Sequence, residues 1–199
     1  MKKLSQMVFA VAMCGAGLVY AGPGDTKAQP APPPTGAKMD MPKGPPQEIA
    51  DMAKAMDGTW KCTGTDMGMD GTSMKFAATM TSKTDLDGWW QHDSLTGTSG
   101  EGKTAMKFKM ESYTTFDPGM KKWHSVSVMN DGGQMVGQSD GMKDMKMDST
   151  ADTWSPMGQG MFKDHIDASD MKKGVHMWGE ASMDKGKTFK PVYDMMCKK

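Results

Sequence analysis

Methionine is the residue type in this sequence whose spacing points most directly to chemistry. The chain has 26 Met among 199 residues, and several of them form Met-x-Met or Met-Met pairs. A thioether sulfur is a soft, uncharged ligand that suits Cu(I), and it persists in oxidising compartments where thiols are lost. The pairs Met67/Met69 and Met145/Met147 therefore predict a site for copper(I) or another soft metal, as one of three explanations of the Met content.

The other two explanations need no metal. Leu and Ile together occur only six times, so Met has to supply much of any apolar core. Exposed Met at turns can also take up oxidants reversibly. Core packing is the leading explanation, and metal binding and oxidant scavenging stay open as alternatives.

The sequence contains no recognisable catalytic motif. The four His residues lie on different predicted strands, at positions 92, 124, 165 and 176. The chain has neither a Gly-x-Ser-x-Gly elbow nor a Cys-x-x-Cys motif. Most Asp residues are expected at turns, where their side chains accept hydrogen bonds from backbone N–H groups. We therefore expect a protein that is not an enzyme and has no resident cofactor, with copper as the alternative.

The charged residues argue against a nucleic-acid partner. The chain has 24 basic and 24 acidic residues, and every basic residue is Lys. A nucleic-acid-binding protein normally has a basic face and uses Arg to contact phosphates and guanines. The expected partner is a small apolar molecule, and the sequence makes no prediction of oligomeric state.

Residues 1–21 have the features of a signal peptide. Lys2 and Lys3 precede a mostly apolar stretch, and Val19-Tyr20-Ala21 offers small residues at the two positions that a signal peptidase recognises. Cleavage there predicts an exported protein, periplasmic or extracellular. The alternative is a lipid anchor on Cys14, because Val11-Ala12-Met13-Cys14 loosely imitates a lipobox. No later stretch is long and apolar enough to span a bilayer.

Two further segments precede the predicted core. Residues 22–46 are rich in Pro and lack helical or strand periodicity, which predicts a disordered tether. A short helix follows, begun by Pro45 and Pro46 and ended by Gly58. Its apolar stripe predicts a lid or plug on the core. The stripe consists of Ile49, Met52, Ala53 and Met56.

The rest of the chain alternates with the period of β-strands. Met74, Phe76, Ala78 and Met80 alternate with polar or small residues, and a second set follows from Met106 to Met110. Turn signals such as Asp87-Gly88 separate about eight to ten such runs, which is typical of a meandering sandwich or barrel. We therefore predict an all-β domain over residues 47–199, an antiparallel up-and-down barrel preceded by one short helix. Closure into a barrel removes exposed strand edges.

Three short motifs carry a resemblance to known proteins. They are Gly58-Thr59-Trp60-Lys61-Cys62-Thr63-Gly64, then Asp87-Gly88-Trp89-Trp90, then Phe116-Asp117-Pro118 with Lys121-Lys122-Trp123. In this order they resemble a bacterial secreted family, classed as a domain of unknown function, that is placed with the calycins. That superfamily contains lipocalins, fatty-acid-binding proteins and nitrobindin-like barrels. The resemblance covers residue 47 to the C-terminus and implies an antiparallel barrel without implying an activity.

The calycin resemblance also implies two details. Lipocalins commonly pack an Arg over the motif Trp, and here a Lys near the C-terminus, such as Lys198, is expected to cover Trp60. Nitrobindin-like calycins hold haem through a His on a late strand. His165 and His176 lie on late predicted strands and match that ligand by position only, since neither is part of a matching motif. Haem is retained as a minor alternative cofactor.

The cysteines predict one disulfide. Once a signal peptide is removed, Cys62 and Cys197 remain, and an even number of Cys in an exported protein favours a bridge. Cys62 lies on the first predicted strand and Cys197 on the last. These strands are neighbours in a closed antiparallel barrel, so the two side chains can meet.

The leading hypothesis for function is a non-enzymatic module that binds an apolar or amphipathic small molecule. A barrel of this size is either filled by its own side chains or holds one ligand. The alternatives are a Met-rich soft-metal-binding protein and a structural envelope protein with a filled barrel. The candidate cavity-lining residues are Trp89, Met106, Phe108, Met110 and Trp123, with Trp178 as a further candidate.

Overall fold

The computed structural model describes residues 43–68, 71–156 and 158–199. The predicted signal peptide, the alternative anchor at Cys14 and nearly all of the predicted tether lie outside the described residues, as does Met69. No helix within the described ranges is long and apolar enough to cross a membrane.

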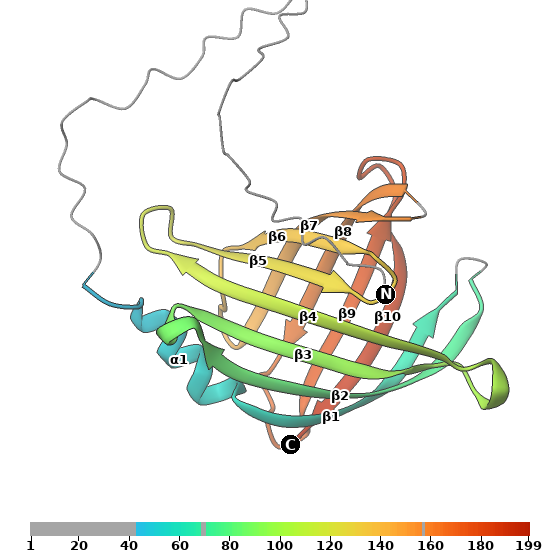
Figure 1. Ribbon diagram of the computed structural model, residues 1–199, viewed down its shortest axis with the longest axis horizontal. Coiled ribbons are helices and arrows are strands. Elements are labelled where there is room, and N and C mark those ends of the chain that lie inside the picture. The colour runs from blue at the N-terminus through green and yellow to red at the C-terminus, as the bar shows by residue number, and fades with distance from the viewer. Residues whose placement is uncertain (1–42, 69–70, 157) are drawn as a thin grey trace, which may run out of the picture. The chain divides into compact units, whose positions relative to one another are not determined.

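Ten antiparallel strands form a closed barrel in chain order (Figure 1). They are β1 (Gly58–Met67), β2 (Ser73–Asp85), β3 (Trp90–Ser99), β4 (Met106–Asp117), β5 (Lys122–Met129), β6 (Gln134–Ser139), β7 (Lys146–Ser155), β8 (Gly158–Asp167), β9 (Val175–Ser182) and β10 (Lys190–Lys198). Each strand pairs with the next, and β1 pairs with β10 to close the barrel. This architecture confirms the predicted all-β, up-and-down barrel.

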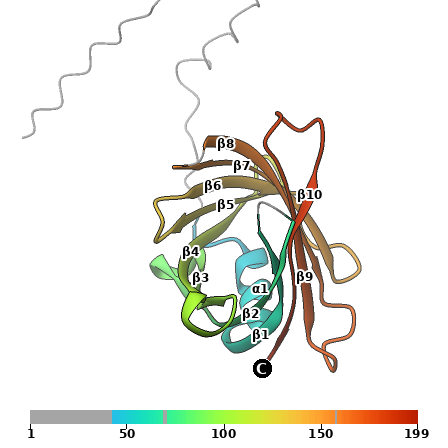
Figure 2. The same cartoon turned by 90° about the vertical axis from the view of Figure 1, so that its right-hand side faces the viewer.

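One helix, α1 (Gln47–Met56), precedes the barrel and packs against β2, β3 and β4. Ile49 on its apolar stripe is 0% exposed, because the helix turns this side chain into the core. The Trp60 indole Nε1–H donates to the Met56 carbonyl at 2.7 Å, which ties the helix to the first strand. The helix lies at the end of the barrel where β1 begins (Figures 1 and 2), here called the closed end. The predicted plug helix is confirmed.

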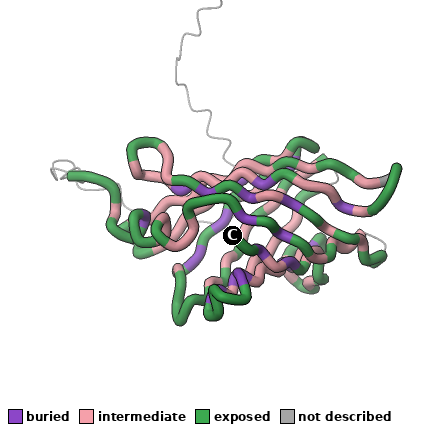
Figure 3. Tube along the Cα trace, turned by 90° about the horizontal axis from the view of Figure 1, so that it is seen from below, coloured by how far each residue is buried: buried purple, intermediate pink, exposed green. Residues whose placement is uncertain are grey.

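The strand register decides which side chains face the interior of the barrel, here called the lumen. Trp60 pairs with Met80, and Met80 pairs with Leu95, and all three belong to the buried core. Residues at even spacing from these therefore face inward, and their neighbours face outward. Figure 3 shows the resulting alternation of buried and less buried positions along the strands. Burial is deepest near β1, β2 and β10.

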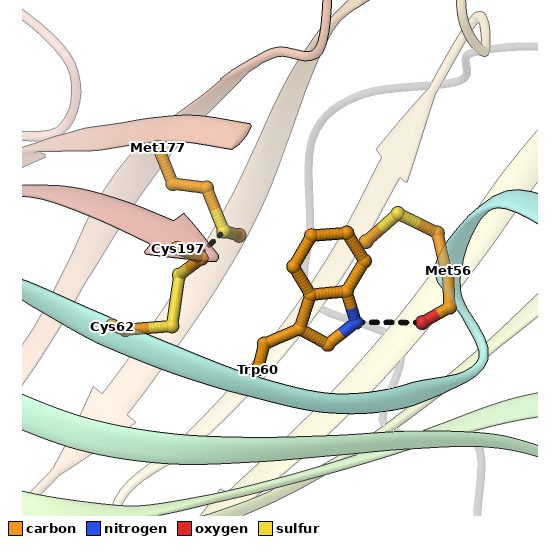
Figure 4. Close-up of a disulfide and its surroundings, with 5 residues drawn as sticks. All are labelled: Met56, Trp60, Cys62, Met177 and Cys197. Atoms are coloured by element: carbon orange, nitrogen blue, oxygen red, sulfur yellow. Dashed lines mark hydrogen bonds between the residues drawn. A yellow bond between two sulfur atoms is a disulfide. The ribbon is translucent and has the colours of Figure 1, made fainter. Parts of the chain in front are cut away.

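A disulfide between Cys62 and Cys197 joins the first and last strands (Figure 4). The two residues are direct partners in the β1–β10 register, with a Cα–Cα distance of 4.0 Å. Both side chains are buried in the core, and Met177 Sδ lies 3.9 Å from Cys197 Sγ. The predicted bridge and the predicted strand pairing are both confirmed.

Lys199, rather than Lys198, covers the motif tryptophan. Its Nζ lies 4.7 Å from the centre of the Trp60 ring and donates to the Ala55 carbonyl at 3.2 Å. Lys198 is exposed because Cys197 occupies the inward position beside it. The expectation for Lys198 was therefore wrong by one residue, since the alternation of β10 points Lys198 away from Trp60.

Candidate functional site

One side of the lumen is an apolar wall formed by β8, β9, β10, β1 and β2. Its centre is a row of registered inward residues, in which Ile166 pairs with Met177 and Met177 pairs with Met195. The wall consists of Trp60, Cys62, Ala78, Met80, Ile166, Val175, Met177, Met195 and Cys197. Met residues fill this wall where Leu or Ile would be usual, and their flexible thioethers pack against irregular neighbours. Core packing thus accounts for part of the Met content.

The opposite side is a hydroxyl wall formed by β4, β5, β6 and β7. Its members are Ser112, Thr114, Ser125, Ser127, Ser139 and Ser149. Three register pairs join them, Ser112 with Ser127, Thr114 with Ser125 and Ser139 with Ser149, and Met135 and Gly137 are the other inward residues of β6. Ser112 Oγ and Ser127 Oγ are hydrogen-bonded to each other at 2.8 Å. A row of inward hydroxyls supplies both donors and acceptors, so this wall suits polar groups that the apolar wall does not. The lumen is therefore amphipathic.

Two aromatic pairs face the lumen. Phe76 of β2 and Phe108 of β4 are stacked with ring centres 5.1 Å apart. Phe116 and Trp123 lie 5.3 Å apart on β4 and β5. These rings extend the apolar surface toward both ends of the hydroxyl wall.

The inward residues of β4 are less buried than those of β1 and β2. From Phe108 to Phe116 they are half-buried, whereas Trp60, Cys62 and Met80 are buried. Two surface depressions, of about 600 and 310 Å³, lie outside the lumen. The first adjoins α1, and the second is lined mainly by outward residues of β6, β7 and β8.

Besides Asp66 near the end of β1, two carboxylates face the lumen from within strands. Asp164 of β8 accepts a hydrogen bond from the Tyr193 hydroxyl, and desolvation raises the pKa of Asp164 to about 6. Asp93 of β3 is the register partner of Ser82 and Ser112. Desolvation raises its pKa too, partly offset by a hydrogen bond from Ser82. Neither carboxylate forms a salt bridge with a Lys of the described chain.

A hydrogen-bonded chain leads from α1 into the lumen at the closed end. Gln91 Nε2 donates to Asp57 Oδ1 at 2.7 Å and to Ser82 Oγ at 2.8 Å. Ser82 in turn bonds to Asp93. Two acceptors are left over, Gln91 Oε1 and Asp93 Oδ1, both buried and without a protein partner. Unsatisfied acceptors of this kind call for a donor from water or from a ligand.

The predicted cavity-lining residues differ in their positions. Phe108 and Met110 face inward and pack against the core, and Trp123 faces inward near the closed end. Met106 has an inward register position but is 57% exposed at the rim. Trp89 lies in the turn between a short 3-10 helix (Leu86–Gly88) and β3. As lining residues for a ligand, these five remain predictions.

Trp178 does not line the lumen, contrary to expectation. It alternates with Met177 and Gly179, which face inward, so its side chain lies on the outer surface of β9. There it is stacked between His165 and His176, with ring centres 5.0 and 4.7 Å away. These imidazoles pair with Asp148 and Asp194 on the same outer face. Neither His can therefore reach a haem placed in the lumen.

The predicted soft-metal methionines are not brought together. Odd-numbered strands run in the same direction, so Met67 at the end of β1 and Met147 near the start of β7 lie at opposite ends of the barrel. Met145 is exposed in the turn before β7, whereas Met147 packs against the core. Each pair would have to bind a metal separately, and such binding remains a prediction. Among the described residues, no group of three or more His, Cys, Asp or Glu side chains is placed to hold a metal ion.

The inward polar residues were missed in the sequence. Asp residues were assigned mainly to turns, whereas Asp93 and Asp164 lie within strands. The available signal was alternation: Asp93 is two residues from Leu95, and Asp164 stands between Phe162 and Ile166 at the same spacing. A polar residue in phase with apolar neighbours faces the interior.

Comparison with models of known protein families finds no match for this chain. Comparison with curated proteins also finds no match. The closed antiparallel barrel is compatible with the calycin-like fold that the sequence motifs imply.

Proposed function

We propose that the protein is an exported, non-enzymatic binding protein that holds one amphipathic small molecule in the lumen of its barrel. The observation that carries this proposal is the division of the lumen into an apolar wall and a hydroxyl wall. A filled structural barrel would favour apolar side chains throughout, because buried hydroxyls are costly without partners.

The half-buried hydroxyls of β4 and β5 support the presence of space for a ligand. Ser112, Thr114 and Ser125 face inward yet remain partly accessible. Ligand sites in proteins are typically concave and mostly apolar, with a few polar groups that orient the bound molecule. The lumen has both components within one barrel.

The Cys62–Cys197 disulfide supports export. Disulfides persist in oxidising compartments such as the bacterial periplasm or the extracellular medium. The bridge therefore agrees with the signal-peptide features of residues 1–21. An exported binding protein would meet its ligand outside the cytoplasm.

Titration with a neutral solvatochromic dye such as Nile red tests this function. We expect saturable binding of one dye per protein, with a blue-shifted emission that reports an apolar environment. Saturation at a different stoichiometry, or no shift at all, contradicts a single site in the lumen.

A matched pair of variants locates the site. Ala151 of β7 faces inward beside Gly137, whereas the adjacent Thr150 faces outward and is exposed. Ala151→Phe is expected to narrow the lumen and weaken dye binding at least tenfold, while Thr150→Phe leaves it unchanged. Equal effects of the two substitutions would show that the dye binds outside the barrel.

A further inference from the structure

The lumen has a marked asymmetry of charge. Asp66, Asp93 and Asp164 occupy inward register positions, while the Lys residues within the strands alternate to the outer surface, with the exception of exposed Lys190 at the start of β10. Lys199 lies over Trp60 at the closed end and donates to a backbone carbonyl. Among the described residues, neither Asp93 nor Asp164 forms a salt bridge with a Lys.

The orientation of the Gln91 amide is fixed by its neighbours. Gln91 Nε2 donates two hydrogen bonds, to the Asp57 carboxylate and to Ser82 Oγ. Exchanging Nε2 and Oε1 would place the amide oxygen against the Asp57 carboxylate, which only accepts hydrogen bonds. Gln91 Oε1 must therefore point elsewhere, and it has no partner although the side chain is only 1% exposed.

Gln91 and Asp93 occupy successive inward positions on β3, so the unpartnered Gln91 Oε1 and Asp93 Oδ1 belong to one small region. Thr114 and Ser112 are their register partners on β4 and extend the polar region into the hydroxyl wall. Leu95, two residues from Asp93, begins the apolar core on the same strand. The region thus has acceptors in excess at its polar end and an apolar surface immediately beside it.

We propose that the ligand is a cationic amphiphile whose primary ammonium group binds at Gln91 Oε1 and Asp93 Oδ1, with its apolar part along the neighbouring core. This inference rests on the proposed function and narrows it to a class of ligand. A primary ammonium group offers three donors and no acceptor, which matches two orphaned acceptors and an adjacent hydroxyl. A carboxylate ligand would instead meet like charge without a compensating Lys, which disfavours a fatty acid.

Three ligands of one chain length test the proposal on the unaltered protein. They are n-decylammonium, decan-1-ol and decanoate, each titrated by displacement of Nile red at pH 7.5 and below its micellar range. We expect n-decylammonium to bind at least tenfold more tightly than either of the others. Equal affinity for decanol, or tighter binding of decanoate, overturns the cationic class while leaving the binding function intact.

Two variants assign the head-group site. Asp93→Asn removes the inward charge, whereas Asp152→Asn removes an exposed charge on the outer face of β7. Asp93→Asn is expected to weaken n-decylammonium binding at least tenfold and to leave decanol binding unchanged, and Asp152→Asn is expected to change neither. An equal loss in both variants would indicate attraction to overall charge and would overturn the site.

The outcomes separate the two proposals. Failure of Nile red and of all three decyl ligands to bind contradicts the proposed function itself. Binding without preference for the amine contradicts only the further inference. If circular dichroism shows that Asp93→Asn is unfolded, the ranking of the three ligands on the unaltered protein decides the class, and Gln91→Leu replaces it as the variant that removes an acceptor.

Discussion

Asp164 is the residue whose chemistry the barrel alters most clearly. Its carboxyl accepts a hydrogen bond from Tyr193, yet desolvation outweighs this bond and raises the pKa of Asp164 to about 6 from 3.8. A raised pKa means that the folded protein holds this proton more tightly than the unfolded chain does. Protonation of Asp164 therefore stabilises the folded protein fully below about pH 4, and this contribution to stability is lost as the pH rises through about 6.

Asp164→Asn is expected to remove this pH dependence. Asn still accepts a hydrogen bond from Tyr193 and carries no charge at any pH. The variant should therefore gain about 3 kcal/mol in stability relative to the wild type between pH 4 and pH 7, from about two units of pKa difference. Urea unfolding of both proteins across this range measures the gain, and parallel stability curves would contradict it.

Other titrating groups cancel in that comparison. Hydrogen bonds from Thr188 and Ser169 lower the pKa values of Asp184 and Asp167 respectively. A lowered pKa adds stability that is present above the unfolded value near 4 and is lost as the pH falls below it. These carboxylates therefore change the free energy of unfolding at pH values below the range in which Asp164 titrates. They do so equally in the wild type and in Asp164→Asn.

At the residue scale, alternation predicted apolar inward positions better than polar ones. Met80, Phe108 and Met110 were assigned to inward faces, and the register confirms them. Gln91 and Asp93 were not identified, because polar residues near Gly-rich turns are usually found on loops. Their partners come from α1 and β2, and contacts across elements of this kind are not visible in a local pattern.

At the scale of elements, α1 was predictable because its signals are local. Pro45 and Pro46 precede it, and the spacing of Ile49 and Met56 gives one apolar face. The helix packs against β2 and accepts a hydrogen bond from Trp60 at the Met56 carbonyl, and both contacts depend on the closed barrel. The sequence therefore predicted that the helix covers the core, but not which strands it contacts. The hydroxyl wall was not predicted, since Ser and Thr alternate in strands without a hydrophobic contrast.

Ile49→Ala tests how far α1 contributes to the stability of the barrel. The Ile49 side chain is fully buried, so truncation leaves a cavity and is expected to cost about 2–4 kcal/mol. Lys54→Ala on the same helix removes only an exposed pair with Asp51 and is expected to cost less than about 0.5 kcal/mol. Chemical denaturation gives both values, and a small effect of Ile49→Ala would mean that the helix is detached in solution.

Gly64 marks the closest approach of β1 to β10. A Cβ built at this position would lie 2.0 Å from the Asp194 carbonyl oxygen and 2.6 Å from Met195 Cα. Gly64→Ala must therefore separate the two strands, at an expected cost of about 3 kcal/mol. Gly44→Ala, with no atom within 4 Å, is the control and should be neutral. Comparable melting temperatures for the two variants would contradict the close approach of β1 to β10 at Gly64.

At the scale of the whole molecule, closure of the barrel was predicted from the number of strand runs, from the removal of exposed strand edges and from the calycin resemblance, and the Cys62–Cys197 bridge was predicted from that closure. A meander of about ten strands is compatible with a sandwich or a barrel. The Cys62–Cys197 pair favours the barrel, because it requires the first and last strands to be neighbours. The division of the lumen into two walls depends on the register across all ten strands, which no single segment encodes.

Removal of the bridge is expected to weaken the whole fold. The disulfide spans 135 residues, so the chain-entropy estimate gives a loss of about 5 kcal/mol for Cys62→Ala with Cys197→Ala. Unfolding of the wild type in dithiothreitol should approach the stability of the double variant. The double variant itself should be insensitive to the reductant, and wild-type stability that is unchanged by reduction would contradict this role.

The position of Cys197 on β10, the last strand of the barrel, also sets the order of events during biogenesis. Chains emerge from the ribosome or a translocon N-terminus first, so Cys62 on β1 has no native partner until all ten strands have appeared. The native bridge consequently reports a finished barrel, and nascent chains that end before Cys197 cannot form it. In a pulse-chase experiment, the Cys62–Cys197 disulfide, formed by thiol–disulfide exchange with an oxidised disulfide of the compartment, should appear only in chains that include β10, with no bridged intermediate of shorter length.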